Sequence, residues 1–149
     1  MAYEELLACL DQMEVLLTRV KDLARRIEIR SGEPDADPNE PLAERQVYIG
    51  RLEKCEKRIS ALLSRLPSGE RGRVERVLFS GGESGGFPEE AALAGYGARC
   101  RALRREIRAC DAESLKQIKR ERDRLQKRIN GSRGPEGRSG APFSSRFLF

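Results

Sequence analysis

The sequence predicts an all-α protein: an elongated antiparallel helical bundle, or coiled-coil hairpin, of three main helices with a disordered C-terminal tail. Of the 149 residues, 36% are charged, 38% are hydrophobic and only 5% are aromatic, with no Trp. Strands favour β-branched and aromatic residues, so a thick sheet-based core is not expected. Long stretches instead repeat apolar residues at alternating steps of three and four, which is the heptad spacing of helices that pack on one another.

The first helix is expected over residues 3–30. Its apolar seam, at steps of four and three, consists of Leu6, Leu10, Met13, Leu17, Val20, Ala24 and Ile27. At about 1.5 Å per residue this helix is roughly 40 Å long. Gly32 ends it, and a short acidic linker follows.

The second helix is expected over residues 41–66. It begins in a segment rich in Pro and acidic residues, which suit the first turn of a helix. Its seam, again at steps of four and three, consists of Tyr48, Leu52, Cys55, Ile59, Leu62 and Leu66. The first two helices have similar lengths and periods and are joined by a short linker, so an antiparallel hairpin is predicted.

A short helix is expected over residues 70–79, before a glycine-rich loop at residues 80–86. That loop lacks the Gly-Lys-Ser/Thr ending and the preceding strand of a phosphate-binding loop, so we interpret it as a connector. The third long helix is expected over residues 98–130, because Gly95 and Gly97 weaken a helix and leave its continuity through them open. Residues 1–130 are therefore predicted to form one helical domain, and residues 131–149 a disordered tail.

The seam of the third helix is less regular than the other two. It consists of Cys100, Leu103, Ile107, Asp111, Leu115, Ile118, Arg122, Leu125 and Ile129. Successive steps of four predict a stutter near Cys110, which locally unwinds a supercoil. This helix is also expected to extend past its shorter neighbours. The candidate partner-binding residues are therefore Leu115, Ile118, Arg122, Leu125 and Ile129, with pairing of two copies of the chain as the simpler alternative.

The tail ends in large apolar residues. Phe143, Phe147, Leu148 and Phe149 lie in a segment rich in Gly, Ser, Pro and Arg, a composition typical of disorder. An exposed apolar segment is of no advantage to a soluble protein unless another molecule binds it. These four residues are therefore predicted to contact a second partner.

Positive charge is concentrated towards the C-terminus. Residues 1–98 carry a net charge of −4 and residues 99–138 carry +8, within a total of +5. Such a basic helix can bind nucleic acid, but Glu106, Glu121 and Asp123 interrupt it, and it offers no aromatic residues for base stacking. A homodimeric coiled-coil scaffold whose basic helix contacts nucleic acid is therefore the alternative function. Binding to a membrane surface is less favoured, because no Trp or Phe accompanies the basic face.

The composition argues against an enzyme. There is no His, the commonest general base and metal ligand. The cysteines, Cys9, Cys55, Cys100 and Cys110, form no C-x-x-C pair and are expected to be reduced packing residues, so neither a metal nor a cofactor is predicted. The carboxylates are expected between the seams, on solvated faces. With no apolar run that could span a membrane and no recognisable signal peptide, a cytoplasmic location is expected.

The whole pattern resembles the flagellar FlgN-type export chaperones and the related FliT-type chaperones. The resemblance rests on the N-terminal heptad helix, on the second helix with ERQVYIGRLE at Glu44–Glu53, and on a charged third helix before a tail ending in SRFLF. It implies a cytoplasmic protein that keeps hook–filament junction subunits, or the filament cap, from polymerising and delivers them to the flagellar export apparatus. It also implies a client-binding surface in the C-terminal helical part, here residues 115–129.

Overall fold

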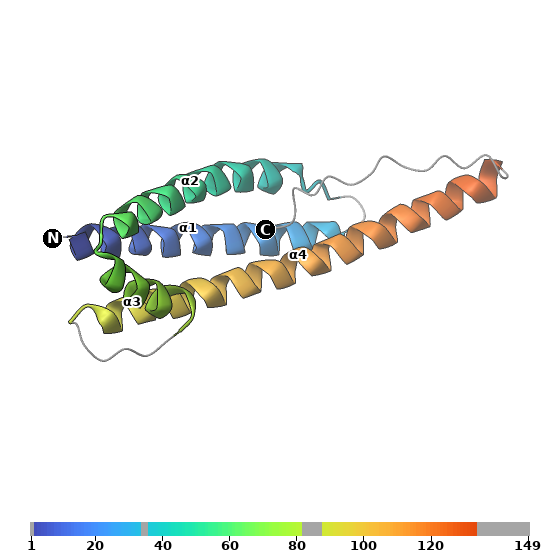
Figure 1. Cartoon of the computed structure of the whole chain (residues 1–149). Coiled ribbons are helices and arrows are strands. Elements are labelled where there is room, and N and C mark those ends of the chain that lie inside the picture. Colours follow the sequence, from blue (N-terminus) through green and yellow to red (C-terminus); the bar gives the residue numbers. More distant parts are fainter. Residues whose placement is uncertain (1, 34–35, 82–87, 134–149) are drawn as a thin grey trace.

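The computed structural model describes residues 2–33, 36–81 and 88–133 of the chain. This part contains four helices, α1 (Ala2–Ser31), α2 (Asn39–Ser64), α3 (Ser68–Phe79) and α4 (Glu90–Arg133), and no strand (Figure 1). The predicted all-α class is therefore confirmed. The loop residues 82–86 and the tail residues Phe143, Phe147, Leu148 and Phe149 lie outside the described residues.

The first two helices form the expected antiparallel hairpin (Figure 1). Near the start of α1, Glu5 pairs with Arg58 of α2 at 2.9 Å. Further along α1, Arg19 pairs with Glu44, which lies near the start of α2. The order of these contacts is reversed along the two helices, as an antiparallel arrangement requires.

The long helix α4 lies against α1 and runs parallel to it. Tyr96 donates a hydrogen bond to Asp11 at 3.2 Å, and Arg99 pairs with Glu14 at 2.9 Å, so both contacts join residues that are 85 positions apart. The short helix α3 turns the chain round after α2 and packs mainly on α4. The three long helices therefore run up, down and up, with α1 between the other two (Figure 1).

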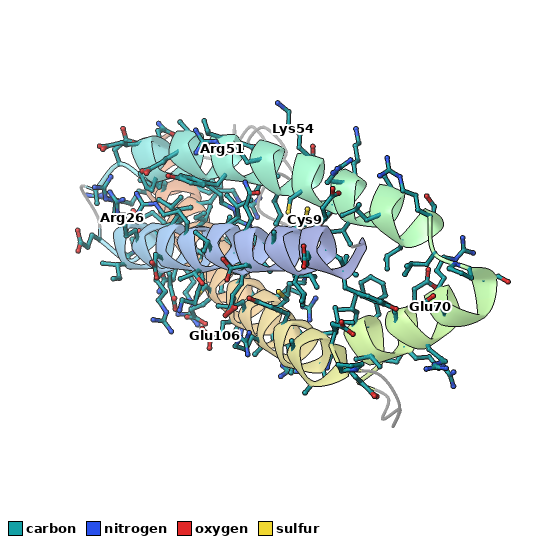
Figure 2. All side chains as sticks on the ribbon, turned by 90° about the vertical axis from the view of Figure 1, so that its left-hand side faces the viewer. Cys9, Arg26, Arg51, Lys54, Glu70 and Glu106 are labelled. Atoms are coloured by element: carbon teal, nitrogen blue, oxygen red, sulfur yellow. The ribbon has the colours of Figure 1, made fainter. Side chains whose placement is uncertain are left out.

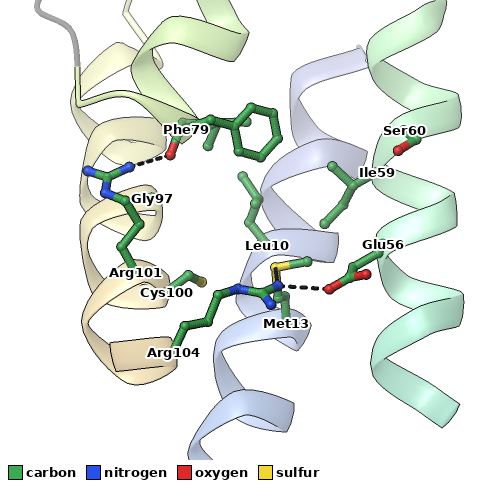
Figure 3. A pocket seen from close by; sticks show the side chains of 11 residues that line it. Leu10, Met13, Glu56, Ile59, Ser60, Phe79, Gly97, Cys100, Arg101 and Arg104 are labelled. Carbon is green, nitrogen blue, oxygen red and sulfur yellow. Dashed lines mark hydrogen bonds and ion pairs between the residues drawn. The ribbon is translucent and has the colours of Figure 1, made fainter. Parts of the chain in front are cut away.

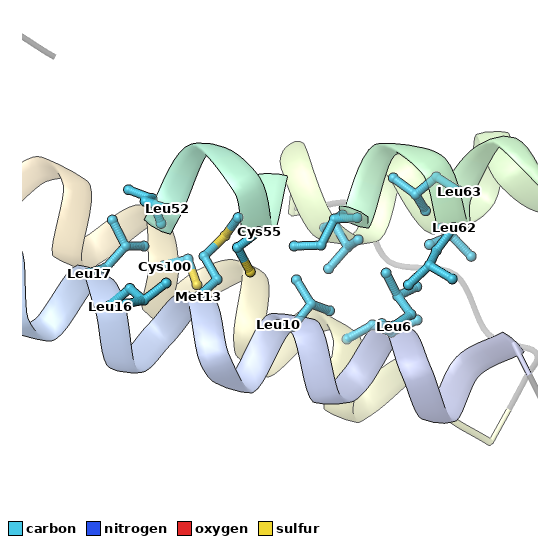
Figure 4. Packing of buried hydrophobic residues seen from close by; sticks show 14 of the residues in the cluster. Leu6, Leu10, Met13, Leu16, Leu17, Leu52, Cys55, Leu62, Leu63 and Cys100 are labelled. Atoms are coloured by element: carbon cyan, nitrogen blue, oxygen red, sulfur yellow. The ribbon is translucent and has the colours of Figure 1, made fainter. Parts of the chain in front are cut away.

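The core lies along α1. All seven residues of its predicted seam are buried, with at most 8% of each exposed. The α2 residues that pack against them are Leu52, Cys55, Ile59 and Leu62, also as predicted (Figure 4). Tyr48 and Leu66, at the two ends of the α2 seam, are half-buried. Full burial of a leucine contributes about 1.5–3 kcal/mol, so this apolar row is the main favourable term holding the hairpin together.

Charged side chains occupy the outer faces of the helices. Arg51 and Lys54 project from α2 into solvent, and Glu106 projects from α4 (Figure 2). Across the described ranges, none of the helices combines the length and the apolar character needed to cross a membrane.

The start of α4 differs from the prediction for the third helix. Instead of spanning residues 98–130, α4 begins at Glu90 and continues through Gly95, Gly97 and Gly131 to Arg133. Residues 131–133 are therefore helical and not part of the predicted tail, and residues 134–149 of that tail lie outside the described residues. Gly97 is buried, and a Cβ there would lie 2.5 Å from the carbonyl oxygen of Leu78. The end of α3 thus approaches the α4 backbone at a distance that only glycine permits. Gly97 is a packing position, not a helix break.

The predicted stutter near Cys110 is also wrong. The buried positions of α4 keep a regular heptad spacing, with steps of four, three, seven, four and three: Leu93, Gly97, Cys100, Ile107, Asp111 and Ser114. Ser114 is 1% exposed and takes the seam position assigned to Leu115, whereas Leu103 is half-buried and packs against the core as predicted. The spacing favours Leu115 because it is apolar, whereas the helix buries the polar Ser114 beside it.

Candidate functional site

The last part of α4 projects beyond the rest of the bundle (Figure 1). The end of α1 lies beside Gln117, because a Cβ on Gly32 would be 3.4 Å from the Gln117 side chain. Residues 118–133, which we term the α4 arm, extend past this point for about 24 Å. No other described helix runs alongside the arm.

The five predicted partner-binding residues fall into two groups. Leu115 and Ile118 are half-buried where the arm leaves the bundle, whereas Leu125 and Ile129 are 47% and 45% exposed and Arg122 is also exposed. Steps of four, three and four place the last four of these five residues on one face of the arm. The structure therefore has the partly exposed stripe that the sequence predicts. That the stripe binds a partner stays a prediction.

The arm is strongly basic. It contains seven Lys and Arg residues and two acidic residues, a net charge of +5. Glu121 pairs with Arg124 at 3.3 Å and Asp123 with Arg122 at 3.7 Å, and all four side chains are more than one third exposed. Exposed pairs of this kind contribute at most about 1 kcal/mol. A large positive surplus therefore surrounds the apolar stripe and favours a partner with an acidic docking surface.

A buried ion pair marks the level at which the arm leaves the bundle. The side chains of Arg45 on α2 and Asp111 on α4 are 1% and 5% exposed. Two guanidinium nitrogens donate to the two carboxylate oxygens, with Nη2 and Oδ2 2.8 Å apart. Asp111 is therefore buried in the seam, as its spacing predicts, and does not lie on a solvated face, as was expected of the carboxylates in general. Arg45 was missed, although it stands three residues before Tyr48 and thus continues the α2 seam towards the N-terminus.

This pair fixes how α2 meets α4. A guanidinium and a carboxylate bound through two parallel hydrogen bonds have a defined geometry. Sliding one helix along the other would leave two buried charges apart, at a cost of several kcal/mol. Ser114, at the next seam position, is buried as well. The apolar core thus gives way to polar side chains at this level, and the arm begins one turn later.

The cysteines pack as small side chains. Cys55 and Cys100 are buried, Cys9 and Cys110 are half-buried, and all four are free thiols. The Cys55 thiol donates to the carbonyl oxygen of Cys9 at 3.2 Å. Burial raises the pKa of the thiols of Cys55, Cys100 and Cys110, which disfavours the nucleophilic thiolate form. Within the described part of the chain, no cluster of three or more His, Cys, Asp or Glu residues could hold a metal ion.

In comparisons with known proteins, no protein-family model, curated protein or solved structure matches the chain. What the protein binds is therefore inferred from its own surface. On that surface the described residues bring an apolar stripe and a surplus of positive charge together on the α4 arm. The tail residues predicted to contact a second partner have no described position.

Proposed function

We propose that this chain is a non-enzymatic, cytoplasmic protein that captures an amphipathic helix of a partner on the α4 arm. One observation carries the proposal: the seam of α4 continues for about four turns past the ends of α1 and α2 and leaves Leu125 and Ile129 about half exposed. A helical stripe of this kind is completed by a second helix that lays its own apolar face along it.

The arm supplies both affinity and selectivity. Burying one exposed Leu or Ile under a partner helix contributes about 1.5–3 kcal/mol, which is about ten- to a hundredfold in affinity. The net charge of +5 on residues 118–133 attracts partners with acidic residues beside their apolar face. The rigid helical form of the arm lowers the entropic cost of binding, since the arm is already ordered.

The resemblance to FlgN-type chaperones suggests which partners the chain binds. We propose that the client is a terminal helix of a flagellar hook–filament junction subunit, or of the filament cap, which would otherwise polymerise or aggregate. The client would then be delivered to the flagellar export apparatus. The apolar residues Phe143, Phe147, Leu148 and Phe149 are the proposed contact with that second partner.

A pull-down with junction subunits from the same organism tests this proposal. The double variant Leu125→Ser/Ile129→Ser should lose most client binding, by about a hundredfold or more, while its melting temperature stays within a few degrees of the wild type. Val15 is 62% exposed on α1, so Val15→Ser is a matched control that should bind normally. Normal binding by the double variant would show that the client docks elsewhere.

A homodimeric scaffold that contacts nucleic acid is the second candidate, and the charge of the arm is the observation that favours it. Phosphate contacts release counterions, so such binding falls steeply as salt rises from 50 to 200 mM. Docking of apolar helix faces is far less sensitive to salt. Fluorescence anisotropy with a labelled DNA duplex measures nucleic-acid binding and its salt dependence. Sedimentation of the free protein shows whether it is a dimer, and the two results together separate the two candidates.

A further inference from the structure

A cavity of about 350 Å³ opens between α1, α2, α4 and the end of α3 (Figure 3). Most of its lining is apolar and includes Leu10, Met13, Ile59 and Leu78, with Phe79 at its rim. The Phe79 side chain is 61% exposed, which is unusual for an aromatic residue in a chain with so few of them. The volume is about twice that of the ~150 Å³ apolar cavity known to hold benzene, and lies within the range of small-molecule sites.

This cavity is bounded at both ends. Towards the arm, Arg104 reaches across from α4 to Glu56 of α2, with Nη2 and Oε1 2.8 Å apart (Figure 3). At the other end stands the last turn of α3, with Leu78 and Phe79. A helix lying along the groove would have to displace one of these barriers. The shape of the cavity therefore favours a compact molecule.

Arg101 places a positive charge at the edge of this apolar space. It lies one turn before Arg104 on α4, is half-buried, and donates a hydrogen bond from Nη1 to the carbonyl oxygen of Leu78 (Figure 3). Among the residues that the structure describes, no carboxylate pairs with the Arg101 guanidinium. A guanidinium has five N–H donors, so donors remain for an anion. The charge of Arg104, by contrast, is balanced by Glu56.

We infer that this cavity binds a compact apolar molecule with one anionic group, of the class of medium-chain carboxylates. The alkyl chain lies against Leu10, Met13 and Ile59, and the carboxylate accepts hydrogen bonds from Arg101. Each buried methylene strengthens binding about fourfold, so a chain of some eight to ten carbons gives measurable affinity. The site is separate from the α4 arm and does not depend on the function proposed for the arm.

Isothermal titration calorimetry of the full chain with decanoate tests the inference. We expect one site per chain, with affinity falling about fourfold per methylene removed down to hexanoate. Decyltrimethylammonium, which has the same chain and the opposite charge, should bind at least about tenfold more weakly. Ser60 is exposed and lines the cavity, so Ser60→Phe should fill it and abolish binding. Ala61→Phe, also exposed but outside the lining, is the matched control and should bind normally.

The anion requirement is tested at Arg101. Arg101→Gln should weaken decanoate binding about tenfold and remove the preference over the cationic probe, whereas Arg105→Gln, an exposed neighbour, should change neither. Thermal melts of Arg101→Gln check that loss of the hydrogen bond to Leu78 has not unfolded α3. If α3 is unfolded in that variant, binding by Ser60→Phe tests whether the ligand occupies the cavity. Leu125→Ser should leave binding intact, which separates the cavity from the arm. Unchanged binding in Ser60→Phe, or equal affinity for the two charged probes, would overturn the inference.

Discussion

The two parts of α4 have the same helical period and differ in what covers them. Residues 90–117 lie against the other helices, and Ile107 is fully buried there. Residues 118–133 continue the helix, but Leu125 and Ile129 remain 47% and 45% exposed. The period of a helix therefore indicates which face can bind, and the lengths of its neighbours decide how much of that face is already occupied. In this chain we expect the covered part to determine stability and the arm to determine binding.

The largest effect is expected when a charge is placed in the covered part. Ile107 is 0% exposed, so Ile107→Asp buries an unpaired carboxylate and should cost about 3–5 kcal/mol, a large fraction of the roughly 5–15 kcal/mol by which a domain is stable. The same change on the arm, Leu125→Asp, should cost about 1 kcal/mol or less, chiefly through helix propensity. Circular dichroism melts of the two variants measure both. Equal losses of stability in the two variants would show that the arm is packed in solution and does not differ from the covered part of α4.

A smaller but still large effect is expected at the boundary between the two parts. Asp111→Ala removes the carboxylate that holds the buried guanidinium of Arg45 and should cost about 3–4 kcal/mol in urea unfolding. The exposed pair of Glu5 and Arg58 is the control, and Glu5→Ala should cost about 1 kcal/mol or less.

The double variant Arg45→Met/Asp111→Leu tests whether the pair provides register or stability. Well-packed apolar residues often replace a buried ion pair at no cost, so this variant should recover most of the lost stability. If it stays as unstable as Asp111→Ala, the cost arises from packing at this site and not from an isolated buried charge.

The sequence predicts the parts of this molecule in which apolar residues alone form the contacts. The α1 seam was predicted residue by residue, because every inward position of that helix is apolar. The projection of the last helix beyond its neighbours was predicted as well, because each helical residue adds about 1.5 Å and this helix has the most residues. On α4 the same method placed Asp111 in the seam but did not predict its partner Arg45, and it chose Leu115 where the polar Ser114 is buried.

Opposite charges at seam positions of two different helices were a signal that could have been used. Arg45 continues the α2 seam and Asp111 lies in the α4 seam, so a helix-to-helix ion pair could be proposed from spacing alone. Gly97 left no such signal. Gly97 is required because Leu78 of another helix approaches it closely. Helix propensity, which depends on local sequence alone, cannot predict such a contact.

Replacing glycine by alanine should have effects of intermediate size, and of opposite sign, in the covered part of α4 and in the arm. Gly97→Ala brings a methyl group within 2.5 Å of the Leu78 carbonyl oxygen and should cost about 1–3 kcal/mol, because the end of α3 must move away. Gly131→Ala, in the last turn of the arm, meets nothing within 4 Å and should raise stability by at most about 1 kcal/mol through helix propensity. Urea unfolding of both variants measures whether each substitution lowers or raises the free energy of unfolding. A stabilising Gly97→Ala would show that α3 does not pack on α4 as described.

The smallest effect is expected at the end of the bundle that lies farthest from the arm, where Tyr3 of α1 donates a hydrogen bond to Glu70 of α3. Burial, together with this hydrogen bond, raises the pKa of Tyr3 from 10.0 to about 12, so the folded protein holds the phenolic proton more tightly than the unfolded chain. The contribution to stability is therefore fully present below pH 10 and is lost as the pH rises from 10 towards 12. Urea midpoints at intervals between pH 9 and about 11.5 should fall more steeply for the wild type than for Tyr3→Phe, in which the other titrating groups are unchanged and cancel in the difference. Helicity of the arm should be the same in both proteins throughout, because α3 contacts only the covered part of α4. Parallel declines in the two midpoints would mean that the Tyr3 hydroxyl is solvated in the folded state, and that this end of the bundle is less closed than its contacts indicate.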